Sequence, residues 1–175
     1  ARGVLPHADA GHPHERVDGQ EREYLWDLHD TPPIRPEDGL PRWFSPVPRV
    51  EVTEYPSWAE VAAWAVPLFS VSSPNSPALN AQIEQLRGAA PDATGRLLAA
   101  LRFVQDDIRY LAIALGPNSH QPQAPSIVLE RRFGDCKGKT ALLLALLDGL
   151  GIPAEAALVN SNLGDGLPDR LPGVG

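Results

Sequence analysis

The single cysteine of the chain, Cys136, lies where a nucleophile could be placed. It precedes the apolar run of residues 141–147, which predicts a buried helix. The unpaired N–H groups and the dipole at a helix start favour a thiolate. Its neighbours Asp135, Lys137 and Lys139 are charged, which argues against the usual role of a free cysteine as a small buried hydrophobe. Local chemistry therefore predicts a reactive thiol, with a structural thiol as the alternative.

Asp135 is predicted to cap this helix. Its carboxylate can accept a hydrogen bond from a backbone N–H two or three residues further on. A negative charge beside Cys136 by itself opposes thiolate formation. Activation of the thiol must therefore come from the helix start, from Lys137 and Lys139, and from a histidine base.

Gly138-Lys139-Thr140 ends like a phosphate-binding loop, but its spacing is wrong. That loop has four residues between its first glycine and Gly-Lys-Thr, whereas Gly134 leaves three. Asp148, the candidate magnesium ligand, follows a leucine run that indicates a helix rather than a strand. Nucleotide binding is therefore disfavoured. A nucleotide-binding chain would be protected by ATP with magnesium, and we expect no such protection.

Several segments together resemble bacterial transglutaminase-like proteins of the papain-like thiol superfamily. They are residues 107–110, Leu115-Gly116, residues 120–122 and, most specifically, residues 133–139 with the sequence Phe-Gly-Asp-Cys-Lys-Gly-Lys. Residues 24–27 and 55–60 resemble the end of the DUF3857-type β-rich domain that precedes the thiol domain in such proteins. The resemblance implies an α+β fold: a transglutaminase-like helical half with the start of a β-sheet, preceded by a partial β-rich domain.

The resemblance also implies acyl transfer by Cys136 on an amide of a peptide or protein, by hydrolysis or cross-linking and without a cofactor. A histidine and an aspartate follow the cysteine in that family, but all five histidines here precede Cys136. We therefore expect the chain to stop before these residues and to be inactive in this form. His120 is the candidate substitute base; the alternatives are a loop residue that lines the substrate and oxyanion region and one that is simply solvated. Tyr110 is either a core residue or, by the resemblance, an oxyanion-stabilising neighbour of the thiol.

A non-catalytic binding or structural module that retains this fold is the competing hypothesis. The formal net charge of −7 argues against nucleic acid and anionic membranes as partners. The sequence contains no run of eighteen apolar residues, so it predicts no membrane-spanning helix. His12 and His14 alternate, but two ligands do not predict a metal site. The family resemblance suggests a periplasmic or envelope-associated protein; no signal peptide is recognisable in residues 1–6, the chain has no methionine, and its oligomeric state is not predicted.

Composition and periodicity predict two parts, residues 1–71 and residues 72–175, joined by a Ser/Pro-rich linker near Ser72. Strands are expected at residues 24–28, 50–52 and 152–159. Helices are expected at residues 57–65, with Ser57 and Glu60 as a capping box, at residues 92–110 and at residues 136–148, with a helical turn or two at residues 79–86. Residues 126–130 are expected to form a helix or a strand, and residues 160–175 a mobile loop.

Overall fold

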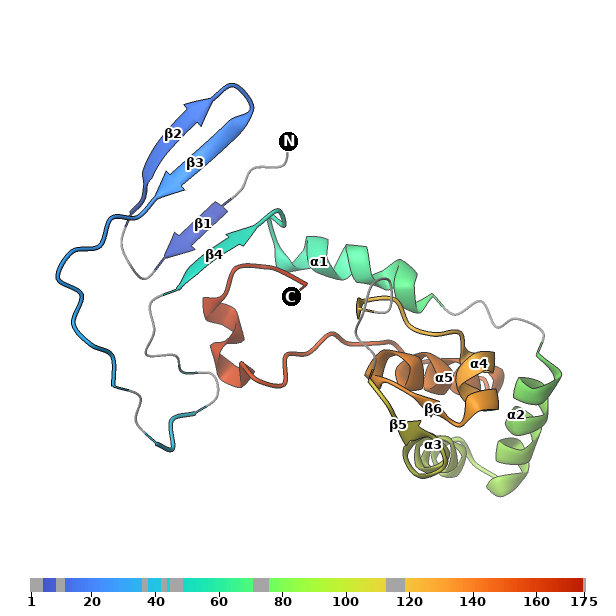
Figure 1. Ribbon diagram of the computed structural model, residues 1–175. Helices are drawn as coiled ribbons and strands as arrows, with labels where there is room; N and C mark the ends of the chain where they lie inside the picture. The colour runs from blue at the N-terminus through green and yellow to red at the C-terminus, as the bar shows by residue number, and fades with distance from the viewer. Residues whose placement is uncertain are drawn as a thin grey trace. The chain divides into compact units, whose positions relative to one another are not determined.

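The computed structural model describes residues 5–8, 12–35, 38–41, 44, 49–70, 76–112 and 119–174. It contains helices and short sheets, in agreement with the predicted α+β class (Figure 1). The chain divides into two compact units, Ala1–Ala62 with Leu158–Gly175, and Ala63–Ala157. The expected linker around Ser72 and the Leu115-Gly116 pair lie outside the described residues. The family assignment of the two parts stays a prediction.

Four strands of the first unit form two antiparallel pairs. β1 (Leu5–Ala8) pairs with β4 (Val50–Thr53), and β2 (His14–Asp18) pairs with β3 (Glu21–Leu25). Gly19 turns the β2–β3 hairpin with a φ of 62°, a left-handed conformation that glycine adopts without steric cost. The sequence predicted β4 and part of β3. It missed β1 and β2, whose charged or proline-containing segments carry few apolar residues.

The C-terminal residues of the chain belong to this same unit. The Leu171 N–H donates to a carboxylate oxygen of Glu51 at 3.0 Å, and Arg170 forms an ion pair with Glu51. Thr53 donates its hydroxyl hydrogen bond to the Pro172 carbonyl. A 3₁₀-helix, Gly164–Asp169, precedes these contacts. The expected loop from residue 160 onward is therefore wrong in part, because polar side chains on β4 bind the returning segment.

Helix α1 (Trp58–Ala65) matches the helix expected at residues 57–65. The Ser57 hydroxyl oxygen accepts a hydrogen bond from the Glu60 N–H at 3.3 Å, which is half of the predicted capping box. Val61 and Ala65 are buried. A 3₁₀-helix, Val66–Phe69, continues from α1 and contains Pro67, which cannot donate to a regular helix.

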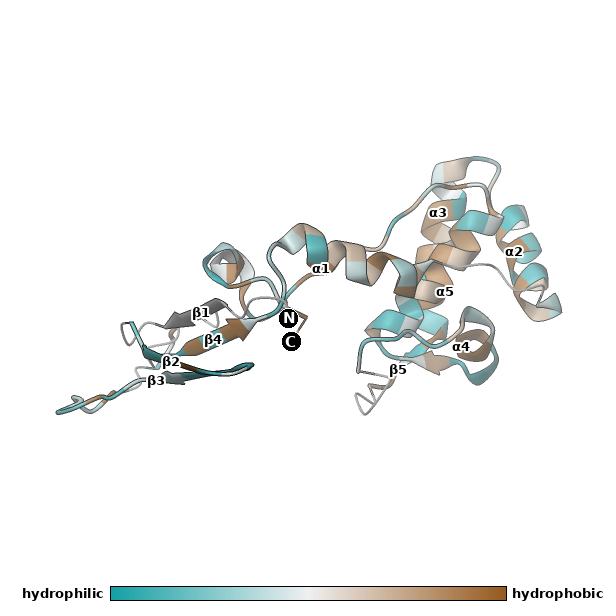
Figure 2. Cartoon of the chain, turned by 90° about the horizontal axis from the view of Figure 1, so that it is seen from above, coloured by the Kyte–Doolittle hydropathy of each residue, from teal (hydrophilic) through white to brown (hydrophobic). Residues whose placement is uncertain are grey.

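In the described part of the second unit, four α-helices pack around one core. They are α2 (Pro77–Ala89), α3 (Ala93–Arg102), α4 (Pro125–Arg131) and α5 (Cys136–Gly149). The largest fully buried side chains are Leu79, Ile108, Leu142, Leu146 and Val128. The apolar part of α5 is visible as the brown stretch of its ribbon (Figure 2). Helix α5 is thus the central element, as its apolar run predicted.

Helix α3 begins where Asp92 caps it, because the Asp92 carboxylate accepts from the Gly95 N–H at 2.7 Å. It passes into a π-helix, Phe103–Asp107, which the sequence analysis did not predict. The spacing of Leu97, Leu101, Val104 and Ile108 predicts one buried face of a regular helix, but Leu97 is 37% exposed while Ile108 is 1% exposed. The wider π-turn changes the angular register, so one regular face cannot extend across it.

Two short parallel strands follow the π-helix and precede α5. β5 (Arg109–Tyr110) pairs with β6 (Phe133–Gly134), with Tyr110 opposite Gly134. The segment expected as a strand at residues 152–159 forms none, although its side chains alternate. Residues 153–159 are exposed and pair with no strand among the described residues, and a strand without a partner leaves its backbone groups to water.

The two alternatives for residues 126–130 resolve to a helix. Helix α4 starts with Pro125 in its first turn, a position where the missing proline N–H costs nothing. From the sequence, Ser126 is the candidate cap of such a helix, but this is wrong, because the N-cap is Ala124, which makes no side-chain hydrogen bond. The helix ends at Arg132, which adopts a left-handed φ of 58°.

Candidate functional site

Cys136 is the first residue of α5 and is exposed. The helix is 14 residues long, so its dipole is fully developed at this end. The first intrahelical bond runs from the Lys139 N–H to the Asp135 carbonyl at 2.9 Å. The N–H groups of Cys136 and Lys137 precede this bond and have no intrahelical acceptor. An exposed thiol beside N–H groups without an intrahelical acceptor is the geometry expected of a nucleophile.

Asp135 has the capping role that the sequence predicted. One carboxylate oxygen accepts from the Gly138 N–H at 2.8 Å, and the other forms an ion pair with Lys137. The side chains are only 18% exposed for Lys137 and 12% for Asp135. The ammonium of Lys137 therefore neutralises the carboxylate of the cap. The electrostatic effect of Lys137 on the thiol is therefore that of an ion pair with Asp135 and not that of a single positive charge.

Lys139 is also committed to a partner other than the thiol. Its ammonium donates to the Ile108 carbonyl at 2.6 Å and to the Gln105 carbonyl at 3.4 Å. No hydrogen bond to the Cys136 sulfur occurs within the part of the chain that the structure describes. Both ammonium groups that the sequence places beside the thiol therefore have other partners, the Asp135 carboxylate for Lys137 and backbone carbonyls for Lys139.

Two glycines allow residues 133–138, called the thiol loop below, to pack closely against α4. A Cβ added to Gly134 would lie 3.1 Å from Cγ1 of Val128, and one added to Gly138 would lie 3.1 Å from Cγ2 of the same side chain. Val128 is fully buried. In the sequence these glycines belong both to the imperfect phosphate-binding loop and to the family-like segment 133–139.

Tyr110 is not a core residue, because it is 63% exposed. Its strand is fixed to the thiol loop through the main chain. The Leu111 N–H donates to the Gly134 carbonyl at 3.1 Å, and the Arg109 N–H donates to the Arg132 carbonyl at 2.9 Å. The structure therefore brings β5 beside the residues that lead into Cys136.

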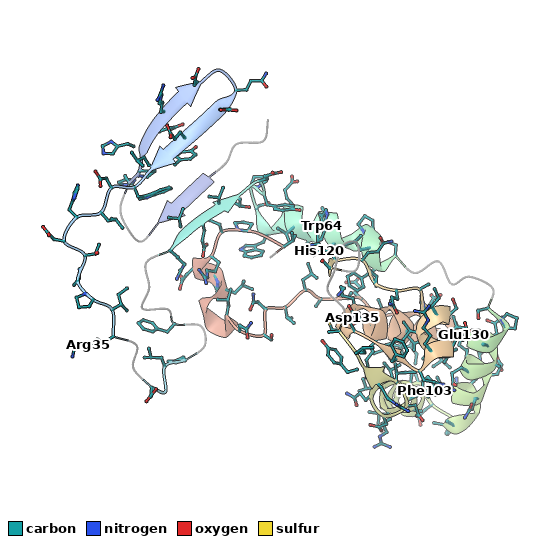
Figure 3. The ribbon with its side chains drawn as sticks, viewed as in Figure 1. Arg35, Trp64, Phe103, His120, Glu130 and Asp135 are labelled. Atoms are coloured by element: carbon teal, nitrogen blue, oxygen red, sulfur yellow. The ribbon has the colours of Figure 1, made fainter. Side chains whose placement is uncertain are left out.

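His120 is exposed and makes an aromatic contact rather than a catalytic one. Its ring lies edge-on to Trp64, with 5.3 Å between ring centroids and an interplanar angle of 80°. Figure 3 labels Trp64 and His120 together. Among the described residues no hydrogen bond joins His120 to Cys136. The structure does not assemble a thiol–imidazole pair from these two residues.

Gln123 is a polar side chain that the sequence analysis missed. Its Oε1 atom is buried and has no hydrogen-bond partner among the described residues. Its Cβ lies 3.8 Å from the position of a Cβ on Gly138, so the side chain packs at the first turn of α5. No local sequence pattern signals an unpaired amide, because burial of Gln123 depends on the packing of the thiol loop.

The described residues give no sign of a metal site or a membrane helix. No group of three or more His, Cys, Asp or Glu side chains among them could hold a metal ion. His12 and His14 both lie at exposed positions in the first unit. No helix in this part of the chain is long and apolar enough to cross a membrane.

Comparisons with known proteins give one informative likeness. No protein-family model matches the chain, and no curated protein matches it. A solved structure from Parabacteroides distasonis ATCC 8503, described as a candidate protease, is similar with a TM-score of 0.67 and 14% sequence identity. The match covers 87% of this chain, which spans 30% of that protein. At this identity the likeness shows a shared fold.

Proposed function

We propose that the second unit is the helical half of a transglutaminase-like cysteine domain that transfers acyl groups from amides of peptides or proteins. The observation that carries the proposal is the exposed Cys136 thiol at the first position of a capped 14-residue helix. The sequence resemblance around residues 133–139 supports it. The fold shared with a candidate protease is compatible with a protease-like function. Residues 1–71 would then contain the end of a DUF3857-type domain, in a periplasmic or envelope-associated protein.

The proposed chemistry starts with attack of the thiolate of Cys136 on the carbonyl carbon. A carbon–sulfur bond forms, and the carbonyl electron pair moves to the oxygen. The N–H groups of Cys136 and Lys137 are the donors available to this oxyanion. The oxyanion then collapses, the carbon–nitrogen bond breaks, and the amine takes a proton. Water or a second amine releases the acyl group, which distinguishes hydrolysis from cross-linking.

Departure of an amine needs an acid, and none of the described residues supplies one at the thiol. A histidine that removes the thiol proton and returns it to the amine normally meets this need. His120 contacts Trp64 instead. The proposed half-site therefore has the nucleophile and the oxyanion donors without the base.

An activated ester tests the nucleophile without the missing acid. The leaving group of p-nitrophenyl acetate departs as a stable phenolate and needs no proton. We expect one acetyl group per chain on Cys136, located by intact mass and peptide mapping, with a burst of nitrophenolate. Cys136→Ser is the matched control and should lose the burst. Acetylation of the folded wild-type chain no faster than of the urea-unfolded chain would refute the proposal.

A non-catalytic module is the second candidate. It is favoured by one observation: no histidine among the described residues is hydrogen-bonded to Cys136. Such a module has no reason to accelerate acylation of its thiol. The comparison of folded and unfolded chains therefore separates the two candidates.

A further inference from the structure

Lys137 and Lys139 lie in the same turn of α5, yet their ammonium groups have different partners. Lys137 pairs with the neighbouring carboxylate of Asp135. Lys139 reaches 31 residues back along the sequence, to the carbonyl of Ile108. A local charge pair needs no tertiary fold, whereas the second contact joins two separate elements. The two lysines therefore differ in what their removal would disturb.

The Ile108 carbonyl lies at a place that needs a donor. Ile108 follows the π-helix Phe103–Asp107 and is 1% exposed. The last carbonyls of a helix lack intrahelical partners, and cations near that end are stabilising. Lys139 supplies such a cation to Ile108 and, at 3.4 Å, to Gln105. Hydrogen bonds to charged groups are the stronger class.

This contact closes a ring that contains the thiol. From Ile108 the chain enters β5, whose Leu111 N–H bonds the Gly134 carbonyl. From Gly134 the chain passes through Asp135 and Cys136 to Lys139. The Lys139 ammonium then returns to Ile108. With the ring closed, the first turn of α5 and strand β5 cannot separate without breaking a hydrogen bond.

We infer that Lys139 is a positioning residue, which holds β5 against the first turn of α5 and so fixes the surroundings of Cys136. The acyl-transfer part of this role rests on the proposed function. The link that Lys139 makes between α5 and the end of the π-helix, which we call the clamp, does not rest on the proposed function, because it follows from the contacts of Lys139 alone. Small displacements near a reacting group are costly to rate, which gives the clamp its functional meaning.

Amide hydrogen exchange tests the clamp without any chemistry at the thiol. Lys139→Met removes the ammonium and keeps the length of the side chain; Lys139→Arg keeps the cation, and Lys137→Met is the matched control in the same turn. We expect exchange of the Leu111 amide to accelerate about tenfold or more in K139M and to stay near wild type in K137M and K139R. The Leu146 amide, deep in α5, should not change.

Acylation of Cys136 by p-nitrophenyl acetate tests the functional part. In K139M we expect the maximal acylation rate to fall about tenfold, with the half-saturating ester concentration unchanged and with recovery in K139R. Unchanged Leu111 exchange in K139M would overturn the clamp. Equal acceleration at Leu111 and Leu146 would show a general loss of stability and would also overturn the positioning role. An unreactive wild-type thiol would refute the proposed function, while the exchange result would still decide the clamp.

Discussion

Replacing Asp135 by asparagine separates the two roles of the cap, because asparagine caps helices as well as aspartate does. The asparagine side-chain oxygen can still accept a hydrogen bond from the Gly138 N–H, which lies 2.8 Å from the Asp135 carboxylate in the wild-type chain. The negative charge that neutralises Lys137 is lost. One uncompensated positive charge then lies close to Cys136 and favours its thiolate.

The size of this effect follows from Coulomb's law. A unit charge on an adjacent residue, several ångströms away in a solvent-like dielectric, changes the free energy of the thiolate by about 0.6 to 1.2 kcal/mol. The thiolate fraction then rises about three- to eightfold. Because the nucleophilicity of a thiolate falls as it is stabilised, the alkylation rate rises less, by about two- to threefold.

The assay is the second-order rate of alkylation of Cys136 by iodoacetamide at pH 7, followed by intact mass. D135N should react about two- to threefold faster than wild type at low salt, and the difference should shrink at high salt, where the added charge is screened. Lys137→Met should react more slowly, because it leaves the carboxylate of Asp135 unpaired. Asp135→Ala should in addition lose about 1 kcal/mol of stability through the lost cap. A folded D135N chain that reacts at or below the wild-type rate would refute the reasoning.

Three further predictions concern packing and pH. Gly149→Ala should destabilise the chain by about 1 to 2 kcal/mol in urea unfolding, because the new Cβ would lie 2.3 Å from Cδ1 of Ile83; the loss should shrink in an Ile83→Val background, and a stabilised G149A would contradict it. Gln123→Met should stabilise by about 1 kcal/mol, since it removes a buried oxygen without a partner; a loss of stability would show that the amide is needed. Burial raises the pKa of Glu51, but the Leu171 N–H and the charges of Arg170 and Arg49 outweigh it and hold the pKa below its usual range. The stabilisation is therefore present at neutral pH and lost as the pH falls below the ordinary range of a glutamate, so protection of the Leu171 amide should decrease in acid; Glu51→Gln should lack this pH dependence, and equal behaviour of both chains would count against it.

Local signals carried most of what the sequence could predict. The cap at Asp135 and the start of α5 at Cys136 depend on neighbouring residues, and the structure has both. The start of α3 after Asp92 is likewise local. By contrast, the partner of Lys139 lies 31 residues away, and no pattern around Lys139 specifies it. Charged residues next to a thiol in sequence need not face it in space.

The π-helix and the missing strand show two other limits. A π-turn adds a residue to a helical turn without an obvious sequence marker, so a regular 3.6-residue period was extended through Phe103–Asp107. The alternation in residues 152–159 is a true strand pattern, but a strand forms only when another strand supplies its hydrogen bonds. Periodicity reports the preference of a segment and does not report its partner.

In the proposed function, Cys136 is a nucleophile with no histidine bonded to it among the described residues, and this combination decides which substrates discriminate between the hypotheses. Under the proposed function, acylation uses the exposed thiol of Cys136 and the backbone N–H groups at the start of α5. Release of an amine needs a proton donor, whereas release of a nitrophenolate does not. A chain with only the first half of the machinery should therefore react with activated esters and fail with peptide amides. Adding free imidazole should accelerate ester acylation if the missing group is a base, and should leave it unchanged if Cys136 is only structural.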